Sequence, residues 1–335
     1  MSDSVARIQL AHGGGGSAMQ ALIATEFSRL YGDPQHLGLD AAALSLPHGR
    51  LAFSTDGYVV QPLEFAGGDI GKLAVIGTAN DLAMAGARPL HLSVALILEE
   101  GLTLAQLRRL VASMVRAASA CGVTIVCGDT KVVARGQADG AFVTTSGIGL
   151  IETPEPIRPA AIRPGDRLLL SGDLGRHGLA ILAARHGLVF NHAVASDCAP
   201  LWPQIEVLLA NGIQPVALRD LTRGGLGCAL GELAEASGCD LVLDEPALPL
   251  APGVAAACAL LGLEPLHLAN EGRFVAVLSP SQADQAMALL APSGAVLVGA
   301  AQRPAGVVPQ VRLQTALGSE RLLGPWSGEL LPRIC

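Results

Sequence analysis

The chain has 335 residues, of which 50% are hydrophobic but only 3% are aromatic. This length accommodates two domains, and their cores must be built from small aliphatic side chains, as in folds that pack helices on sheets. With 22 basic and 29 acidic residues, the net charge of -7 opposes binding to nucleic acid or to an anionic membrane.

No segment of the sequence has the properties of a membrane span. The longest uncharged stretch, residues 247–263, contains Pro249 and Pro252, whereas a span needs about 20 mainly apolar residues in an unbroken helix. Residues 1–10 lack the apolar core and cleavage site of a secretory signal. The seven cysteines include no Cys-x-x-Cys pair, so we expect neither disulfides nor structural zinc. These features predict a cytoplasmic protein.

The first half of the chain alternates between predicted strands and helices. A short strand over 51–55 delivers Asp56 and Gly57 into a turn. After it we expect, in chain order, a helix over 72–86, an alternating strand over 90–98, an amphipathic helix over 104–115, and strands over 123–126 and 141–150.

The second half follows the proline-rich segment 153–164, which marks the best domain boundary. Here we expect a strand over 166–170, helices over 177–186, 205–210 and 226–237, and strands over 241–243, 274–278 and 296–298. Beyond residue 302 the pattern weakens to one final strand and a tail.

The fold class is therefore α/β (α+β) with two domains. The expected divisions are a glycine-rich N-terminal segment, two domains and a mobile C-terminal tail, which span residues 1–40, 41–155, 160–312 and 313–335.

Four aspartates stand where the sequence is typical of turns, namely Asp56, Asp81, Asp129 and Asp220. Carboxylates that converge at one edge of a sheet, together with phosphate oxygens and water, are the ligands that Mg²⁺ selects. Each aspartate taken singly fits an Asx-turn or a helix cap as well. Their placement beside glycines and threonines favours a site for a metal and a nucleotide.

Glycine clusters at 13–16, 67–68 and 224–225 would let backbone N–H groups approach phosphate closely. The known nucleotide signatures do not match, because Lys72 is followed by leucine rather than by serine or threonine, and no strand precedes the first cluster. A bound nucleotide would therefore need a different architecture.

Lys131 and Glu271 each lie in a polar segment that is predicted to be a turn between apolar stretches. If the fold brings them together they can form a pair that handles protons. The alternative is a surface ion pair or two unrelated solvated residues. His177, beside Gly178, is the histidine best placed to reach an active site.

The last residue is Cys335, which follows Pro332, Arg333 and Ile334. A thiol at the end of a chain has no following segment to bury it, so a tail can carry it to a site elsewhere. Arg333 either steers that tail toward phosphate or is a solvated charge.

Several motifs, in order along the chain, resemble the HypE family of hydrogenase maturation factors. They are residues 54–60 (STDGYVV), 67–74 (GGDIGKLA), 80–84 (NDLAM), 128–133 (GDTKVV), 220–226 (DLTRGGL), 270–273 (NEGR) and 332–335 (PRIC). Leu221 stands where proline is typical of the family. This change leaves Asp220 and Thr222 intact.

The resemblance implies the two-domain fold of aminoimidazole ribonucleotide synthetase (PurM-like), with N-terminal domains that pair in a homodimer around sites for ATP and Mg²⁺. It implies metal ligands at Asp56, Asp81 and Asp220. It implies that Lys131 and Glu271 form a pair that handles protons. It also implies further nucleotide contacts, which are Asp69, Lys72, Asn80, Asp129 and Thr130.

The implied reaction is an ATP-dependent dehydration of a carboxamide on Cys335 to a thiocyanate. By the same resemblance, the HypF protein supplies the carbamoyl group, and a complex of HypC and HypD receives the nitrile on iron. Two other functions stay open: a small-molecule kinase or ligase of the same superfamily, and a scaffold that holds iron or a partner through its terminal thiol.

Overall fold

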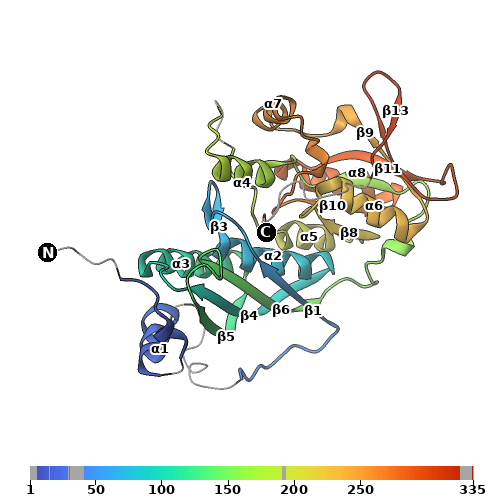
Figure 1. The fold of residues 1–335 in the computed structure, drawn as a ribbon. Coiled ribbons are helices and arrows are strands. Elements are labelled where there is room, and N and C mark those ends of the chain that lie inside the picture. Colours follow the sequence, from blue (N-terminus) through green and yellow to red (C-terminus); the bar gives the residue numbers. More distant parts are fainter. Residues whose placement is uncertain are drawn as a thin grey trace. The chain divides into compact units, whose positions relative to one another are not determined.

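The computed structural model describes residues 6–14, 16–28, 30, 41–190, 194–324 and 334. These residues form two compact units (Figure 1). The N-terminal unit comprises the described residues up to 83 together with 87–151, and the C-terminal unit comprises 84–86 and 152–334. Each unit has its own sheet and helices, which confirms the expected two-domain α/β class. Among the described helices, none is both long and apolar enough to cross a bilayer.

The N-terminal unit is built on a four-stranded sheet with the order β1-β6-β4-β5. Its strands are β1 (Leu51–Tyr58), β4 (Ala87–Glu99), β5 (Thr124–Val133) and β6 (Ala141–Ile151). β6 runs antiparallel to both neighbours, whereas β4 and β5 are parallel. A parallel pair needs a crossover connection, and helix α3 (Leu104–Cys121) provides it.

Two helices, α3 and α2 (Ile70–Met84), lie on one side of this sheet (Figure 1). α3 begins where the Thr103 side chain accepts a hydrogen bond from the Gln106 N–H, and it ends at Gly122, whose φ of 67° suits glycine. Among the described elements, Figure 1 shows no helix that covers the other side of the sheet in the way that α2 and α3 cover the first. We call this other side the open side. Smaller elements precede and join these: α1 (Ser17–Leu22), a π-helical turn (Ile23–Phe27), β2 (Glu64–Phe65) and β3 (Gly68–Asp69).

The C-terminal unit contains a seven-stranded sheet with the order β13-β12-β9-β11-β7-β10-β8. Its strands are β7 (Arg167–Leu170), β8 (Ala217–Asp220), β9 (Asp240–Asp244), β10 (Phe274–Leu278), β11 (Val296–Gln302), β12 (Val311–Gln314) and β13 (Glu320–Leu322). Its helices are α4 (Arg176–His186), α5 (Trp202–Ala210), α6 (Gly225–Ser237), α7 (Pro252–Leu261) and α8 (Pro280–Leu290).

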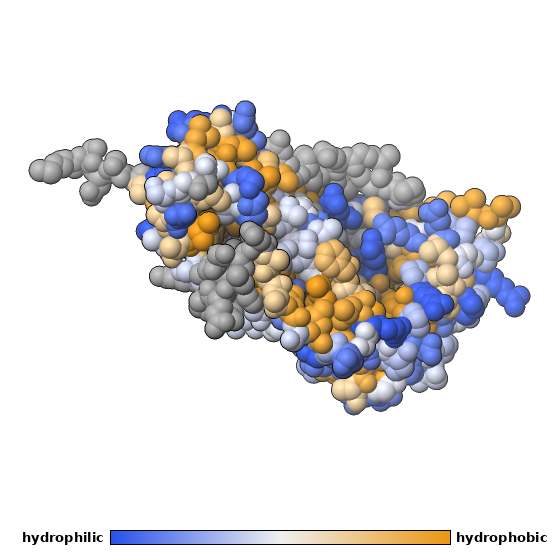
Figure 2. Space-filling model, turned by 90° about the horizontal axis from the view of Figure 1, so that it is seen from below, coloured by the Kyte–Doolittle hydropathy of each residue, from blue (hydrophilic) through white to orange (hydrophobic). Residues whose placement is uncertain are grey.

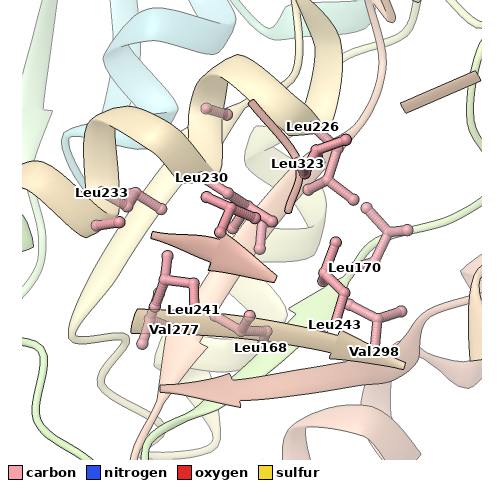
Figure 3. Packing of buried hydrophobic residues seen from close by; sticks show 14 of the residues in the cluster. Leu168, Leu170, Leu226, Leu230, Leu233, Leu241, Leu243, Val277, Val298 and Leu323 are labelled. Atoms are coloured by element: carbon pink, nitrogen blue, oxygen red, sulfur yellow. The ribbon is translucent and has the colours of Figure 1, made fainter. Parts of the chain in front are cut away.

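The core of this unit lies between α6 and the sheet (Figure 3). Leu226, Leu230 and Leu233 recur at helical spacing and are buried against Leu168 and Leu243 of the strands. Burying each such side chain contributes about 1.5–3 kcal/mol. This packing anchors the elements whose ends carry the candidate site.

The structure corrects two of the predicted turns. Asp56 and Gly57 lie inside β1, where they pair with Thr145 and Thr144 of β6. The segment with Asp129 and Lys131 continues β5, because its parallel pairing with β4 runs on to Val133. In both cases the tertiary neighbours override the local preference for a turn. Asp81 lies within α2, as the predicted helix over 72–86 indicates.

Helices α7 and α8 and strand β8 are absent from the predicted elements. Both helices begin at a proline, Pro252 and Pro280. Proline at the first helical position is favourable, since its missing N–H would have no partner there. The first structured elements, around α1, were also missed in a segment read as glycine-rich.

Candidate functional site

Asp56 and Asp81 lie on the helix-covered side of the N-terminal sheet. The Ser54 hydroxyl donates to Asp81 Oδ2 at 2.7 Å. Asp56 pairs with Thr145, and the Thr145 hydroxyl donates to the Ala74 carbonyl of α2 at 3.0 Å. Since paired residues share a face, the Asp56 side chain is on the α2 side, like that of Ser54. The two predicted metal ligands of this unit therefore share a side of the sheet.

Asp69 and Lys72 meet at the start of α2. The Lys72 backbone N–H donates to Asp69 Oδ1 at 3.0 Å, and the Lys72 ammonium donates to the Gly67 carbonyl at 2.9 Å. Burial raises the pKa of the Asp69 carboxyl, although hydrogen bonds from Ser113 and from backbone N–H groups oppose the shift. Asn80 is buried in the same helix.

Asp129 and Lys131 form an exposed ion pair on β5, with the Lys131 Nζ 2.7 Å from Asp129 Oδ2. The hydrogen bond from Lys131 lowers the pKa of the Asp129 carboxyl. Their partners across the parallel ladder are Ala95 and Ile97, whose side chains belong to the face turned away from α2. Thr130 alternates to the other face and is buried.

In the N-terminal unit, Asp56 and Asp81 are therefore separated from the Asp129–Lys131 pair. β1 and β5 are the opposite edge strands of the sheet, and Asp56 lies on the α2 side while Asp129 lies on the open side. Exposed hydrophobic residues, Leu51 and Phe53 among them, occupy this open side. The view from below in Figure 2 shows hydrophobic residues gathered in patches.

In the C-terminal unit, Asn270 and Glu271 lie in a buried loop that precedes β10. Asn270 Oδ1 accepts from the Gly175 N–H at 2.7 Å, and its Nδ2 donates to the carbonyls of Leu221 at 3.2 Å and Leu268 at 3.0 Å. Glu271 is only 3% exposed. The three side-chain hydrogen bonds of Asn270 hold the loop in place, which favours a fixed geometry for the adjacent Glu271.

Asp220 is the last residue of β8 and pairs with Phe274, the first residue of the antiparallel β10. The Asn270 N–H also donates to the Leu221 carbonyl at 2.9 Å. Asp220 and the Glu271 loop consequently lie at the same end of this sheet. Of the predicted site residues, these two are the pair that the C-terminal unit brings to one region.

Several polar residues near this loop escaped sequence reasoning. Asp197 accepts from the N–H groups of Glu271 and Gly272, both at 3.2 Å. Asp173 forms ion pairs with Arg273 and Arg176; burial works to raise the pKa of its carboxyl, but the two guanidinium groups outweigh it and the pKa is lowered. The only signal for Asp173 is its place in a glycine turn after a predicted strand.

His177, the histidine singled out from the sequence, is completely buried at the start of α4. It lies 2.8 Å from the Ser196 hydroxyl and 2.8 Å from the Ile334 carbonyl. Burial lowers the pKa of the His177 imidazole, although the Ile334 hydrogen bond and Asp197 oppose the shift. Cys335 and Arg333 lie outside the described residues, and Lys131 and Glu271 belong to different units.

Comparison with known proteins places this arrangement in a family. Residues 38–151 match the N-terminal domain of AIR synthase related proteins, and residues 163–311 match their C-terminal domain. The carbamoyl dehydratase HypE of Rhodobacter capsulatus is 51% identical over 334 residues, which cover 98% of each chain.

Solved structures agree. A crystal structure of the hydrogenase maturation protein HypE in complex with ATP has a TM-score of 0.92 at 45% identity, and covers 97% of this chain and 99% of that one. A HypE–HypF complex has a TM-score of 0.79 at 39% identity, and covers 91% and 99%. The chain therefore belongs to the HypE family of hydrogenase maturation proteins, within the AIR synthase related proteins.

Proposed function

We propose that this protein is an ATP-dependent carbamoyl dehydratase. It would convert a carboxamide on the Cys335 sulfur into a thiocyanate, which supplies cyanide ligands for the iron of [NiFe]-hydrogenase. The observation that carries the proposal is the 51% identity, over 98% of both chains, to a protein named carbamoyl dehydratase HypE. Cys335, in the Pro-Arg-Ile-Cys motif of residues 332–335, is the proposed carrier.

The chemistry explains why ATP is required. A thiocarbamate, S–C(=O)–NH₂, does not lose water unaided, because hydroxide is a poor leaving group. The carboxamide oxygen therefore attacks the γ-phosphorus of ATP, the bond to ADP breaks, and one nitrogen proton is lost. Removal of the second nitrogen proton, with cleavage of the C–O bond, yields S–C≡N and inorganic phosphate.

We assign the proton transfers to Glu271 and Lys131. The backbone of Glu271 is held in a buried loop by Asn270 and Asp197, and we assign its carboxylate the role of the base near nitrogen. Lys131 is 62% exposed on its strand, where its ammonium can meet a bound ligand. Transfer of a phosphoryl group depends mainly on such positioning and on electrostatic stabilisation.

ATP is the proposed co-substrate, and support comes from the HypE relative solved in complex with ATP. Asp69, Lys72, Asn80, Asp129 and Thr130 are the proposed contacts in the N-terminal unit. Lys72 lies at the start of α2 and Lys131 neighbours two of the others, so cationic groups are available for phosphate.

Mg²⁺ fits the chemistry of the proposed ligands Asp56, Asp81 and Asp220, which offer only hard carboxylate oxygens. No cluster of three or more His, Cys, Asp or Glu residues that could hold a metal occurs among the residues that the structure describes. Mg²⁺ binds carboxylate oxygens of this kind and completes its shell with phosphate and water. When bound, the ion would neutralise charge on the phosphates.

A homodimer formed through the N-terminal units would cover the open side of the four-stranded sheet around β1, the edge strand opposite β5 with its Asp129–Lys131 pair. Phe53 on this side is 70% exposed, and an apolar sheet face of this kind marks an interaction surface. Phe53→Lys should yield monomers in analytical ultracentrifugation, whereas Leu260→Lys, at a comparably exposed position in α7, should leave the dimer intact. A Phe53→Lys protein that still dimerises would contradict this interface.

The other proposed partners follow the reaction. HypF would supply the carbamoyl group, as the solved HypE–HypF complex supports, and the HypC–HypD complex would take the nitrile onto iron. All these steps are proposed to occur in the cytoplasm. The segment after β13 would act as the carrier that moves Cys335 between partners.

The test is intact-mass analysis after incubation with HypF and its carbamoyl donor, with and without ATP. We expect a carbamoyl adduct that loses one water only when ATP is present, and no adduct on the Cys335→Ala variant. Dehydration or full activity in that variant would favour a small-molecule kinase or ligase. A complete absence of ATP hydrolysis would favour a scaffold.

A further inference from the structure

The C-terminal unit binds the end of the chain through His177. The imidazole Nε2 lies 2.8 Å from the Ile334 carbonyl oxygen, and Ile334 itself is only 5% exposed. On the other side of the ring, Nδ1 lies 2.8 Å from the Ser196 hydroxyl. Both ring nitrogens are therefore engaged, one of them by the residue that precedes the terminal cysteine.

The partners determine where the proton of the ring resides. A carbonyl oxygen only accepts, so Nε2 carries the hydrogen and donates it to Ile334. Nδ1 then accepts from the Ser196 hydroxyl, whose oxygen in turn accepts from the Cys198 N–H at 3.1 Å. These hydrogen bonds give both nitrogens of a neutral imidazole a partner. Burial favours the neutral form by lowering the pKa of His177.

The same segment is tied to the loop that carries Glu271. Asp197 follows Ser196 and accepts from the Glu271 and Gly272 N–H groups. From α4, the Gly178 N–H donates to the Ala269 carbonyl at 2.9 Å. The residues that hold Ile334 and the residues that hold Glu271 thus form one hydrogen-bonded cluster.

We propose that His177 is a positioning residue that binds the last peptide carbonyl of the chain and so delivers the terminal thiol to the Glu271 loop. The proposal rests on the proposed function, in which Cys335 carries the reacting carboxamide. The Ile334 carbonyl carbon is bonded directly to the nitrogen of Cys335. Fixing this carbonyl therefore limits how far the sulfur can move from the hydrogen-bonded cluster that also holds the Glu271 loop, which raises its local concentration there.

A single neutral hydrogen bond also suits a carrier that must leave. Its net contribution corresponds to a change of about five- to tenfold in the docked population. Such a bond favours the docked state without preventing release to partners. A charged or bidentate contact would hold the tail more firmly.

Carboxypeptidase digestion measures docking directly. The bond that the protease cleaves first joins Ile334 to Cys335, and its carbonyl is the group bound by His177. Cleavage therefore requires the undocked tail, and its rate follows the undocked fraction. Release of Cys335 is read as a loss of mass from the intact protein, with no need for ATP or for any partner.

We expect His177→Phe, which keeps a ring but removes the donor, to release Cys335 about five- to tenfold faster than wild type. His177→Gln, which keeps an N–H near the position of Nε2, should stay within about twofold. His186→Phe is the matched control, because His186 is exposed at the other end of the same helix, and it should match wild type.

An unchanged release rate in a folded His177→Phe protein would overturn the proposal. If that variant fails to unfold cooperatively, Ser196→Ala decides instead. Loss of the Ser196 hydroxyl frees the ring to adopt the other tautomer and should speed release, so an unchanged rate there would overturn the proposal equally.

A second readout separates this inference from the proposed function. In single-turnover dehydration, His177→Phe should lower the rate by about the same factor, leave the affinity for ATP unchanged, and be rescued by His177→Gln. If His177→Phe releases Cys335 faster but wild type shows no dehydration, the positioning role of His177 is supported and the proposed dehydratase function is refuted. If His177→Phe dehydrates at the normal rate, only the positioning role of His177 is refuted.

Discussion

The two units present their candidate residues in opposite ways. In the N-terminal unit, the side chains of Lys131 and Asp129 are 62% and 56% exposed on an edge strand. In the C-terminal unit, Asn270 and His177 are fully buried and Glu271 is 3% exposed. The first arrangement is a surface that a ligand can complete, and the second is a framework whose geometry is set before any ligand arrives.

This difference has a physical cause. An exposed ion pair is screened by water and contributes little to folding, so the Lys131 ammonium can exchange its carboxylate partner for a bound ligand. A buried amide or carboxylate is tolerated only when hydrogen bonds compensate for lost hydration. We therefore expect substitutions in the N-terminal group to change activity without affecting stability, and substitutions in the buried cluster to affect both.

The largest expected effect is that of Glu271→Gln. Without the base, carbamoylated protein should accumulate and lose water about a hundredfold or more slowly in a single turnover with ATP. Glu232→Gln, at an exposed position paired with Arg219, is the matched control. Dehydration by Glu271→Gln at a rate within a few fold of wild type would remove Glu271 from the mechanism.

Lys131→Gln tests the exposed group. We expect a fall of about a hundredfold in the rate of dehydration, since the proposed partner of Glu271 in proton transfer is lost. The free energy of unfolding in urea should change by less than about 1 kcal/mol, because an exposed ion pair contributes no more than this. A large loss of stability with a normal rate of dehydration would contradict the view that the exposed group serves activity rather than folding.

Asn270→Ala tests the buried cluster. The change leaves the Gly175 N–H and the Leu221 and Leu268 carbonyls without their side-chain partner. It should therefore lower the free energy of unfolding by about 2 kcal/mol. Asn211→Ala removes one exposed hydrogen bond to Val207 and should have little effect. Equal losses in the two variants would show that burial is unimportant here.

The smallest effect concerns pH. Burial holds the pKa of His177 below its ordinary value of 6.5, so the unfolded chain binds more protons between the two values. The neutral, buried imidazole of His177 therefore makes its full contribution to the free energy of unfolding above pH 6.5, and this contribution is lost as the pH falls toward the pKa of the folded state. Urea unfolding at about pH 7.5 and about pH 5.5 should show a larger acid loss for wild type than for His177→Gln. Identical losses would contradict the buried neutral imidazole.

The regular parts of the fold could be predicted from the sequence. Leu107, Val111 and Met114 recur at helical spacing, and α3 is where they indicate. Asp129 and Lys131 were misread because a Gly-Asp-Thr-Lys run is typical of a turn, while the pairing of β5 with β4 depends on residues far away in the sequence.

Asp220 and Glu271 were singled out from their polar, turn-like sequence context, and the resemblance to a family added their proposed roles, which stay predictions. Asp197 has no local signature, because its role depends on N–H groups more than 70 residues further along the chain. The Ile334 contact of His177 spans 157 positions, a distance over which local pattern gives no information.

The most direct test of the account follows the carboxamide oxygen. Protein carbamoylated with a heavy-oxygen label on the carbonyl is given unlabelled ATP for one turnover, and the phosphate produced is analysed by mass spectrometry. Transfer of the oxygen to the γ-phosphorus predicts that the label appears in inorganic phosphate as the nitrile forms on Cys335. Nitrile formation with the label in water, and none in phosphate, would contradict the phosphorylation that the mechanism requires.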